Sequence, residues 1–265
     1  PLWVLAHTLD DHRPTAAHRT MSAAEERLAD DPTSELWGEH RSRYRFAAQF
    51  ADGRRVLDVA CGSGFGLGML RAAGGRPVGV DYDALTLHEV RREQSDEPLL
   101  TADATCLPLA AASLDTVVSF ETIEHVPDAR ALVQELRRVL RPGGRLILST
   151  PNREFGPIAR HTANRFHIRE FTASELRQML SESFEQVQLF GQRPVPAYRY
   201  VPFLMVESHV EPSALVWKLQ VRLPYGVKNR LALALTGRPF YPGEADYRFE
   251  PEATDGAHAL LAVAW

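Results

Sequence analysis

The strongest structural signal in the sequence is the stretch Val56-Leu57-Asp58-Val59-Ala60-Cys61-Gly62-Ser63-Gly64-Phe65-Gly66. It opens with a short apolar run between Arg55 and a glycine cluster, which is typical of a buried parallel strand. The glycines allow the backbone to turn sharply and to approach a ligand without a Cβ in the way. A dinucleotide-binding fingerprint would need a further glycine where Leu67 stands, so the spacing alone does not identify the ligand.

Apolar runs and helical patterns alternate from this stretch to residue 190. One helix is predicted near residues 128–141, and another begins at a capping box formed by Thr172 and Glu175. Such alternation predicts an α/β fold with a doubly wound, mostly parallel sheet covered by helices on both faces. After the strand of the opening stretch, further strands are predicted at 77–81, 98–102, 114–120, 145–150 and 184–190.

Composition divides the chain into three parts. Residues 1–35 are polar and interrupted by prolines, which predicts an N-terminal arm or lid. Residues 36–190 and 256–265 form the predicted main domain, which the second range completes with a final strand. Residues 191–255 are rich in proline and aromatic side chains, so we expect an insert between the last two strands that caps the substrate. An accessory packing or dimerisation element is the alternative for this insert, in which a helix is predicted at 226–236.

The overall composition is that of an ordinary globular protein, with 45% of the 265 residues hydrophobic and 24% charged. A net charge of -4 argues against an extended surface that coats nucleic acid, so no nucleic-acid partner is expected. Cys61 and Cys106 are too few for a disulfide framework, which favours a cytoplasmic location. No apolar run reaches about 18 residues, so no membrane contact is expected.

Three carboxylates accompany the predicted strands. Asp81 ends the second strand, where a carboxylate can accept hydrogen bonds from both hydroxyls of a ribose. Asp103 follows the third strand and suits an exocyclic adenine amine, while Asp58 lies beneath the glycines, where a cationic amino group would be favoured. Because no lysine or P-loop pattern accompanies the glycines, a positively charged nucleoside fits better than a pyrophosphate. Each carboxylate could instead cap the backbone at the end of a strand or helix.

In this order and combination, the motifs resemble those of class I S-adenosylmethionine (SAM)-dependent methyltransferases, and more loosely those that act on sugars and other small molecules. The resemblance implies SAM as the cofactor and a seven-stranded sheet whose final strand is antiparallel. Ala60 departs from the glycine that family members often have. Besides the opening stretch, the motifs are Gly79-Val80-Asp81, Ala102-Asp103-Ala104, Phe120-Glu121-Thr122-Ile123-Glu124-His125-Val126 and Glu135-Leu136-Arg137-Arg138-Val139-Leu140-Arg141-Pro142-Gly143-Gly144.

The same resemblance implies which residues hold each part of SAM. It implies contacts to the methionine end from Asp58, Gly62 and Gly64, to the ribose from Asp81, to the adenine from Tyr82, Asp103 and Ala104, and to the methyl side from Phe120 and Glu121.

A hydroxyl acceptor must lose a proton, and histidine titrates in the useful range. His125 follows the fourth predicted strand and His167 follows the fifth, and with Glu121 they form the predicted catalytic set. Asn152 and Arg153 are the predicted substrate contacts, in a loop whose arginines suit an anionic or sugar acceptor. Both histidines could instead have packing roles. Weaker candidates are His161 and, in the arm, His7, His12 and His18.

A divalent metal is a further alternative at Glu121, Glu124 and His125, whose carboxylates and imidazole are close in sequence. No DxD-like or histidine-rich spacing supports it, so the sequence predicts no metal site.

The sequence therefore predicts an enzyme that transfers a methyl group from SAM to a small molecule, with a hydroxyl of a sugar, glycan or secondary metabolite as the favoured acceptor. The alternatives are an N-methyltransferase of an amino sugar or metabolite and a methyltransferase of nucleic acid or protein. A NAD-dependent oxidoreductase is disfavoured by Leu67, and a non-catalytic SAM-binding module by the intact glycines and carboxylates. A homodimer is compatible with these patterns.

Overall fold

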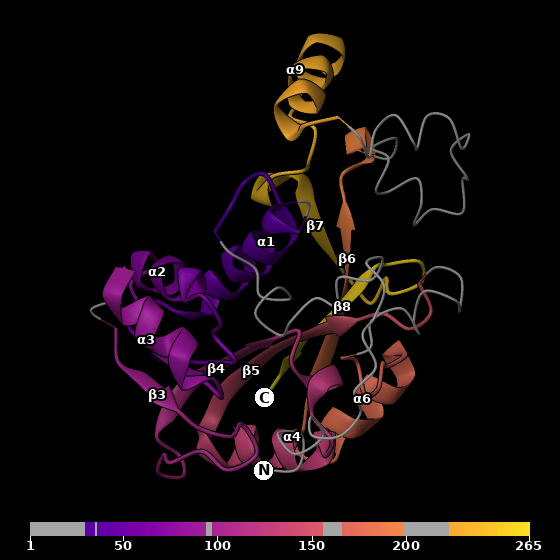
Figure 1. Ribbon diagram of the computed structural model, residues 1–265. Coiled ribbons are helices and arrows are strands. Elements are labelled where there is room, and N and C mark those ends of the chain that lie inside the picture. The colour runs from indigo at the N-terminus through magenta and orange to yellow at the C-terminus, as the bar shows by residue number, and fades with distance from the viewer. Residues whose placement is uncertain (1–29, 35, 94–96, 156–165, 199–222) are drawn as a thin grey trace, which may run out of the picture.

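A computed structural model describes residues 30–34, 36–93, 97–155, 166–198 and 223–265. Its strands form one eight-stranded sheet in the order β3-β2-β1-β4-β5-β8-β6-β7 (Figure 1). The strands are β1 (Arg55–Val59), β2 (Arg76–Asp81), β3 (Leu99–Thr101), β4 (Leu114–Phe120), β5 (Leu140–Pro151), β6 (Val187–Pro194), β7 (Tyr247–Pro251) and β8 (Ala259–Ala264). The α-helices are α1 (Trp37–Ala47), α2 (Phe65–Ala72), α3 (Ala84–Glu93), α4 (Ala129–Val139), α6 (Ala173–Ser181) and α9 (Tyr225–Thr236). Short 3-10 helices are η1 (Ala48–Phe50), η2 (Ile123–His125), η3 (Pro196–Tyr198) and η4 (Glu244–Asp246).

The predicted α/β fold with a doubly wound, mostly parallel sheet is confirmed. Strands β1 to β5 are parallel to one another, and the final strand β8 lies antiparallel between β5 and β6. The sheet has eight strands and not seven, because β7 pairs antiparallel with β6 at the edge. Strand β7 comes from the segment 191–255, so part of the expected insert extends the sheet itself.

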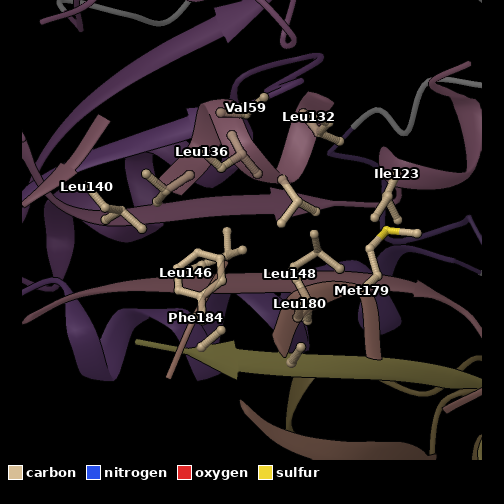
Figure 2. Close-up of a cluster of buried hydrophobic side chains, with 14 of the residues drawn as sticks. Val59, Ile123, Leu132, Leu136, Leu140, Leu146, Leu148, Met179, Leu180 and Phe184 are labelled. Carbon is tan, nitrogen blue, oxygen red and sulfur yellow. The ribbon is translucent and has the colours of Figure 1, made fainter. Parts of the chain in front are cut away.

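Helices cover both faces of the sheet (Figure 1). On one face, Leu132 and Leu136 of α4 and Leu180 of α6 pack against Leu146 and Leu148 of β5 (Figure 2). On the other face, α1 and α2 pack against residues of the central strands β1, β4 and β5, among them Val56, Val118 and Ile147. Because both faces are buried, the central strands read as continuous apolar runs in the sequence.

The helix boundaries follow local signals in the sequence. The side chain of Asp128 caps α4 by accepting from the Ala131 amide at 3.0 Å. Thr172 and Glu175 form the predicted capping box of α6. The predicted helix over 128–141 ends at Val139, earlier than expected, because Leu140 already pairs with Leu114 as the start of β5.

The described part of the segment 191–255 contains the end of β6, the helix α9 near its predicted place, and β7. Helix α9 has no buried residue and stands beyond the ends of β6 and β7 (Figure 1). The role of this segment as a substrate cap stays a prediction. Most of the predicted arm, residues 1–35, lies outside the described residues. No described helix has both the length and the apolar character needed to cross a membrane.

Candidate active site

The first feature of the site is the turn from Ala60 to Gly64, here called the glycine turn, which joins β1 to α2. The carboxylate of Asp81, at the end of β2, holds this turn: its Oδ2 accepts from the Gly62 amide at 2.9 Å, and its Oδ1 accepts from the Asp83 amide at 3.0 Å. Gly62 and Gly64 have φ values of 53° and 75°, a region that glycine adopts without steric cost. Asp81 and the glycine turn therefore meet at the carboxyl ends of β1 and β2, where ligands bind in open α/β sheets.

Ala60 shares this left-handed conformation, with a φ of 60°. For a residue with a Cβ the left-handed region costs about 1–2 kcal/mol. This is a physical reason for the glycine that resembling sequences often carry at the position. The glycine turn is therefore held under some strain at its first residue, next to the place where we expect the cofactor.

Asp58, on β1 beneath the glycine turn, is fully buried. Its carboxylate accepts from the hydroxyl of Tyr44 on α1, at 3.0 Å to Oδ2. Burial raises the pKa of Asp58 to about 7; the Tyr44 hydrogen bond opposes this rise and the charge of Asp81 adds to it. A buried carboxylate without a cationic partner in the described structure is a natural acceptor for an ammonium group. Its contact with the methionine end of SAM stays a prediction.

The raised pKa of Asp58 makes a prediction about stability. In the unfolded chain the group ionises near its ordinary value of 3.8, and in the folded protein near 7, so folding loses stability as pH rises through this window. The replacement Asp58→Asn removes the titration. At each pH, urea unfolding gives the free energy of unfolding of the variant minus that of the unchanged protein. We expect this difference to increase by up to about 4 kcal/mol from pH 4 to pH 8. Parallel pH profiles for the two proteins would contradict the assignment.

At the adenine end, the structure places the three predicted residues around the carboxyl ends of β2 and β3. Tyr82 directly follows β2 and is exposed, and Ala104 is half-buried. Asp103 is exposed, and both hydrogen bonds that it accepts, from the amide and the hydroxyl of Thr105, use Oδ1. These positions agree with the expected contacts, which stay predictions.

At the end of β4, Phe120 and Glu121 lie beside α1. The ring of Phe120 packs edge-on against Tyr44, with centroids 5.0 Å apart. Glu121 has a φ of 48°, and its Oε1 accepts from the Ser149 hydroxyl at 2.8 Å and pairs with Arg43 at 3.2 Å. The carboxylate of Glu121 is therefore held by partners from β5 and α1.

The two candidate histidines meet in space, and we call His125 and His167 the imidazole pair. Their ring centroids lie 4.9 Å apart with an interplanar angle of 75°. His125 Nδ1 lies 3.1 Å from the Phe166 carbonyl oxygen, and His167 Nδ1 lies 2.8 Å from a carboxylate oxygen of Glu170. Since both neighbours are acceptors, each Nδ1 donates its proton, and in the neutral rings each Nε2 carries a lone pair.

The two predicted substrate contacts, Asn152 and Arg153, both have partners within the chain. Asn152 is 1% exposed, and its Nδ2 donates to the carbonyl oxygens of Thr254 and Ala257 while its Oδ1 accepts from the Glu154 amide. These bonds join the end of β5 to the turn before β8, and the contact of Asn152 with the acceptor stays a prediction. Arg153 forms an ion pair with Glu175 at 2.9 Å, at the start of α6.

The arginine-rich rim is also partly neutralised. Arg169 pairs with the same carboxylate of Glu175 at 3.7 Å. The rest of the predicted rim, Arg160 and Arg165, lies outside the described residues, as do the candidate histidines His7, His12, His18 and His161.

Sequence reasoning missed the contribution of α1 to the site. Tyr44 donates to Asp58 and packs on Phe120, and Arg43 is fully buried against Glu121. The spacing of Trp37, Arg41, Tyr44 and Ala48 places them on one face of a helix, which is a signal for the packing of Tyr44 but not for its hydrogen bond. No sequence signal marks Arg43, because a buried arginine is rare and its acceptors come from distant segments.

The fold and the site define a nucleoside-binding α/β protein, and the comparisons with known proteins specify its family. Residues 57–148 match the family model "Methyltransferase domain". The chain is 34% identical over 192 residues to the probable S-adenosylmethionine-dependent methyltransferase Rv3030 of Mycobacterium tuberculosis, covering 70% of each chain. The chain belongs to the SAM-dependent methyltransferases, whose methyl donor is SAM.

Two further comparisons agree. A probable S-adenosylmethionine-dependent methyltransferase of Mycolicibacterium smegmatis is 39% identical over 150 residues, which is 56% of this chain and 58% of the relative. The chain thus spans less than two thirds of that relative's length. A solved SAM-dependent methyltransferase of Thermotoga maritima, described as a possible histamine N-methyltransferase, has the same fold, with a TM-score of 0.58 at 17% identity. That alignment covers 87% of this chain and 90% of the Thermotoga chain.

Proposed function

We propose that this protein transfers the methyl group of SAM to a hydroxyl of a small molecule, and that the hydroxyl loses its proton at the imidazole pair. The observation that carries the proposal is the meeting of two imidazoles, 4.9 Å apart, just beyond the carboxyl end of β4. An amine acceptor needs only its neutral form, whereas a hydroxyl needs a group to take up its proton. Paired imidazoles with lone pairs on Nε2 therefore favour a hydroxyl.

The proposed cofactor contacts follow the carboxyl ends of four strands. Asp81 accepts from the ribose, the residues after β2 and β3 contact the adenine, and Asp58 faces the amino group of the methionine part. The methyl group then lies toward Phe120 and Glu121. In the reaction the new O–C bond forms in line as the C–S bond breaks, which releases S-adenosylhomocysteine. Since sulfonium is already an activated leaving group, positioning supplies much of the acceleration.

The acceptor that we propose is a small hydroxylated molecule, such as a sugar or a phenolic metabolite. Arg153 and Arg169 share the carboxylate of Glu175, which compensates part of the positive charge of this rim, so a strongly anionic acceptor is not required. The net charge of -4 likewise favours a small molecule over a nucleic acid.

The test of the proposed function is methyl transfer from radiolabelled SAM to a panel of hydroxyl acceptors and matched amines. We expect a methyl ether product, and we expect His167→Gln to lower kcat by about 100-fold or more while SAM affinity stays unchanged. The control His88→Gln changes an exposed histidine of α3 and should leave both quantities unaltered. Transfer to amines alone, or full activity of the His167 variant, would overturn the proposal.

A further inference from the structure

A carboxylate joins the imidazole pair in space. Glu124 and His125 are adjacent on η2, and one ligand atom from each of Glu124, His125 and His167 lies within 4.8 Å of the others. Two imidazoles and one carboxylate at this separation are the ligand types of an open catalytic metal site. Glu121 is not counted among the ligands, because Ser149 and Arg43 hold its Oε1.

The buried carboxylate of Glu124 lacks a partner on one side. Its side chain has no exposed surface, and its Oε2 accepts from the Thr150 hydroxyl at 2.9 Å. Among the described residues its Oε1 has no hydrogen-bond partner, and His125 Nε2 lies 3.9 Å from it. A cation at this position would give the buried Oε1 a partner that the described residues do not supply.

The imidazole pair is also oriented as metal ligands are. A ligating histidine usually donates its other ring N–H to a carboxylate or a backbone carbonyl, which fixes the ring and its tautomer. His125 Nδ1 faces the Phe166 carbonyl and His167 Nδ1 faces Glu170, so the atom by which each ring would ligate an ion is Nε2.

The main chain fastens the two ligand-bearing segments together. The amides of Ile168 and Arg169 donate to the Glu124 carbonyl at 2.8 and 3.2 Å. The segment that carries His167 is therefore held against η2 through backbone bonds, independently of any ion. Such a site needs little rearrangement to bind a ligand.

From this arrangement we infer that Glu124 Oε1, His125 Nε2 and His167 Nε2 bind a divalent transition-metal ion. Two imidazoles favour Zn²⁺, Co²⁺ or Mn²⁺ over Mg²⁺, which prefers oxygen ligands. Three protein ligands leave a position for the oxygen of an acceptor. Resting on the proposed function, the ion would lower the pKa of that hydroxyl, so that its proton passes to solvent water while the metal carries the charge of the oxygen. With the ion bound, the Nε2 lone pairs of the imidazole pair hold the ion and do not accept the proton, so the ion takes over the part that the proposed function gives to the imidazoles.

The test is calorimetric titration of the chelator-treated chain with Zn²⁺, and separately with Mg²⁺, without SAM or acceptor. We expect one Zn²⁺ per chain, bound at least about tenfold more tightly than Mg²⁺. Loss of a residue that orients a metal ligand typically weakens metal binding by about 10–100-fold, and we expect a loss in this range for Glu170→Gln. His167→Asn removes a ligand itself, so we expect it to weaken Zn²⁺ binding by more than about 100-fold. His88→Asn should bind Zn²⁺ as the unchanged protein does.

A second variant guards against misfolding. Glu124→Gln keeps an acceptor for Thr150 and removes the buried charge, so we expect a stably folded chain with strongly reduced Zn²⁺ affinity. Absence of Zn²⁺ binding, equal affinity for Zn²⁺ and Mg²⁺, or unchanged Zn²⁺ affinity in both His167→Asn and Glu124→Gln would overturn the inference. Because this titration uses no acceptor, its outcome is independent of whether the product of catalysis is a methyl ether.

Discussion

Replacing Asp81 with alanine should weaken SAM binding by at least about 100-fold, measured by calorimetry with SAM or S-adenosylhomocysteine. The structure gives two reasons. The carboxylate already holds the glycine turn through the Gly62 amide and the chain after β2 through the Asp83 amide, and it is the proposed acceptor for the ribose hydroxyls. Each hydrogen bond to a charged group contributes about 1.5–3 kcal/mol, so loss of two or more such bonds exceeds the roughly 2.7 kcal/mol that a 100-fold change requires.

The matched control is Asp128→Ala, which removes another structural aspartate that accepts from a backbone amide. It caps α4, away from the glycine turn, so its loss should cost about 1 kcal/mol of stability and leave SAM affinity unchanged. If Asp81→Ala bound SAM as tightly as the control does, the ribose contact and the role of the glycine turn would both be wrong.

Replacing Arg43 with methionine should lower the free energy of unfolding by about 3–5 kcal/mol, the cost of removing one partner from a buried ion pair. The guanidinium is fully buried, forms ion pairs with Glu39 and Glu121, and donates from Nε to Gln192 at 2.7 Å. Methionine would fill much of the volume but leave the carboxylate of Glu39 with His258, at 3.3 Å, and without its guanidinium partner. Urea unfolding of the two proteins measures the difference.

Arg41→Met is the control on the same helix. Arg41 is partly exposed and pairs with Asp30 and Glu244 at the surface, where an ion pair contributes about 0–1 kcal/mol. Equal losses for the two variants would show that the buried charges do not hold α1 to the sheet. The comparison also concerns the site, because Arg43 positions Glu121 at the end of β4.

Much of the fold could be predicted because buried parallel strands are short apolar runs that stand out from their flanks. Strand β4, predicted at 114–120, has those bounds in the structure. Strand β7 could not be predicted in this way. Its residues Tyr247–Pro251 alternate polar and apolar side chains among prolines, and its place at the edge depends on pairing with β6 and on the packing of Phe249 against Phe46.

The part of the site at the ends of adjacent parallel strands could be predicted from the sequence. Asp81 and the glycine turn are neighbours because adjacent parallel strands end at the same edge. His125 and His167 were candidates from the sequence, but the meeting of Glu124 with His167 was not predictable, because it depends on backbone bonds between η2 and a distant loop. The partners of Asn152, the carbonyls of Thr254 and Ala257, could not be predicted either, because they come from a segment about a hundred residues further along the chain.

A crystal structure with bound S-adenosylhomocysteine tests the central claim most directly. The account predicts the ribose hydroxyls within hydrogen-bond distance of Asp81, the adenine beside Asp103, and the sulfur directed toward the imidazole pair. Density for the nucleoside at any other edge of the sheet, or a sulfur directed away from His125 and His167, would contradict it.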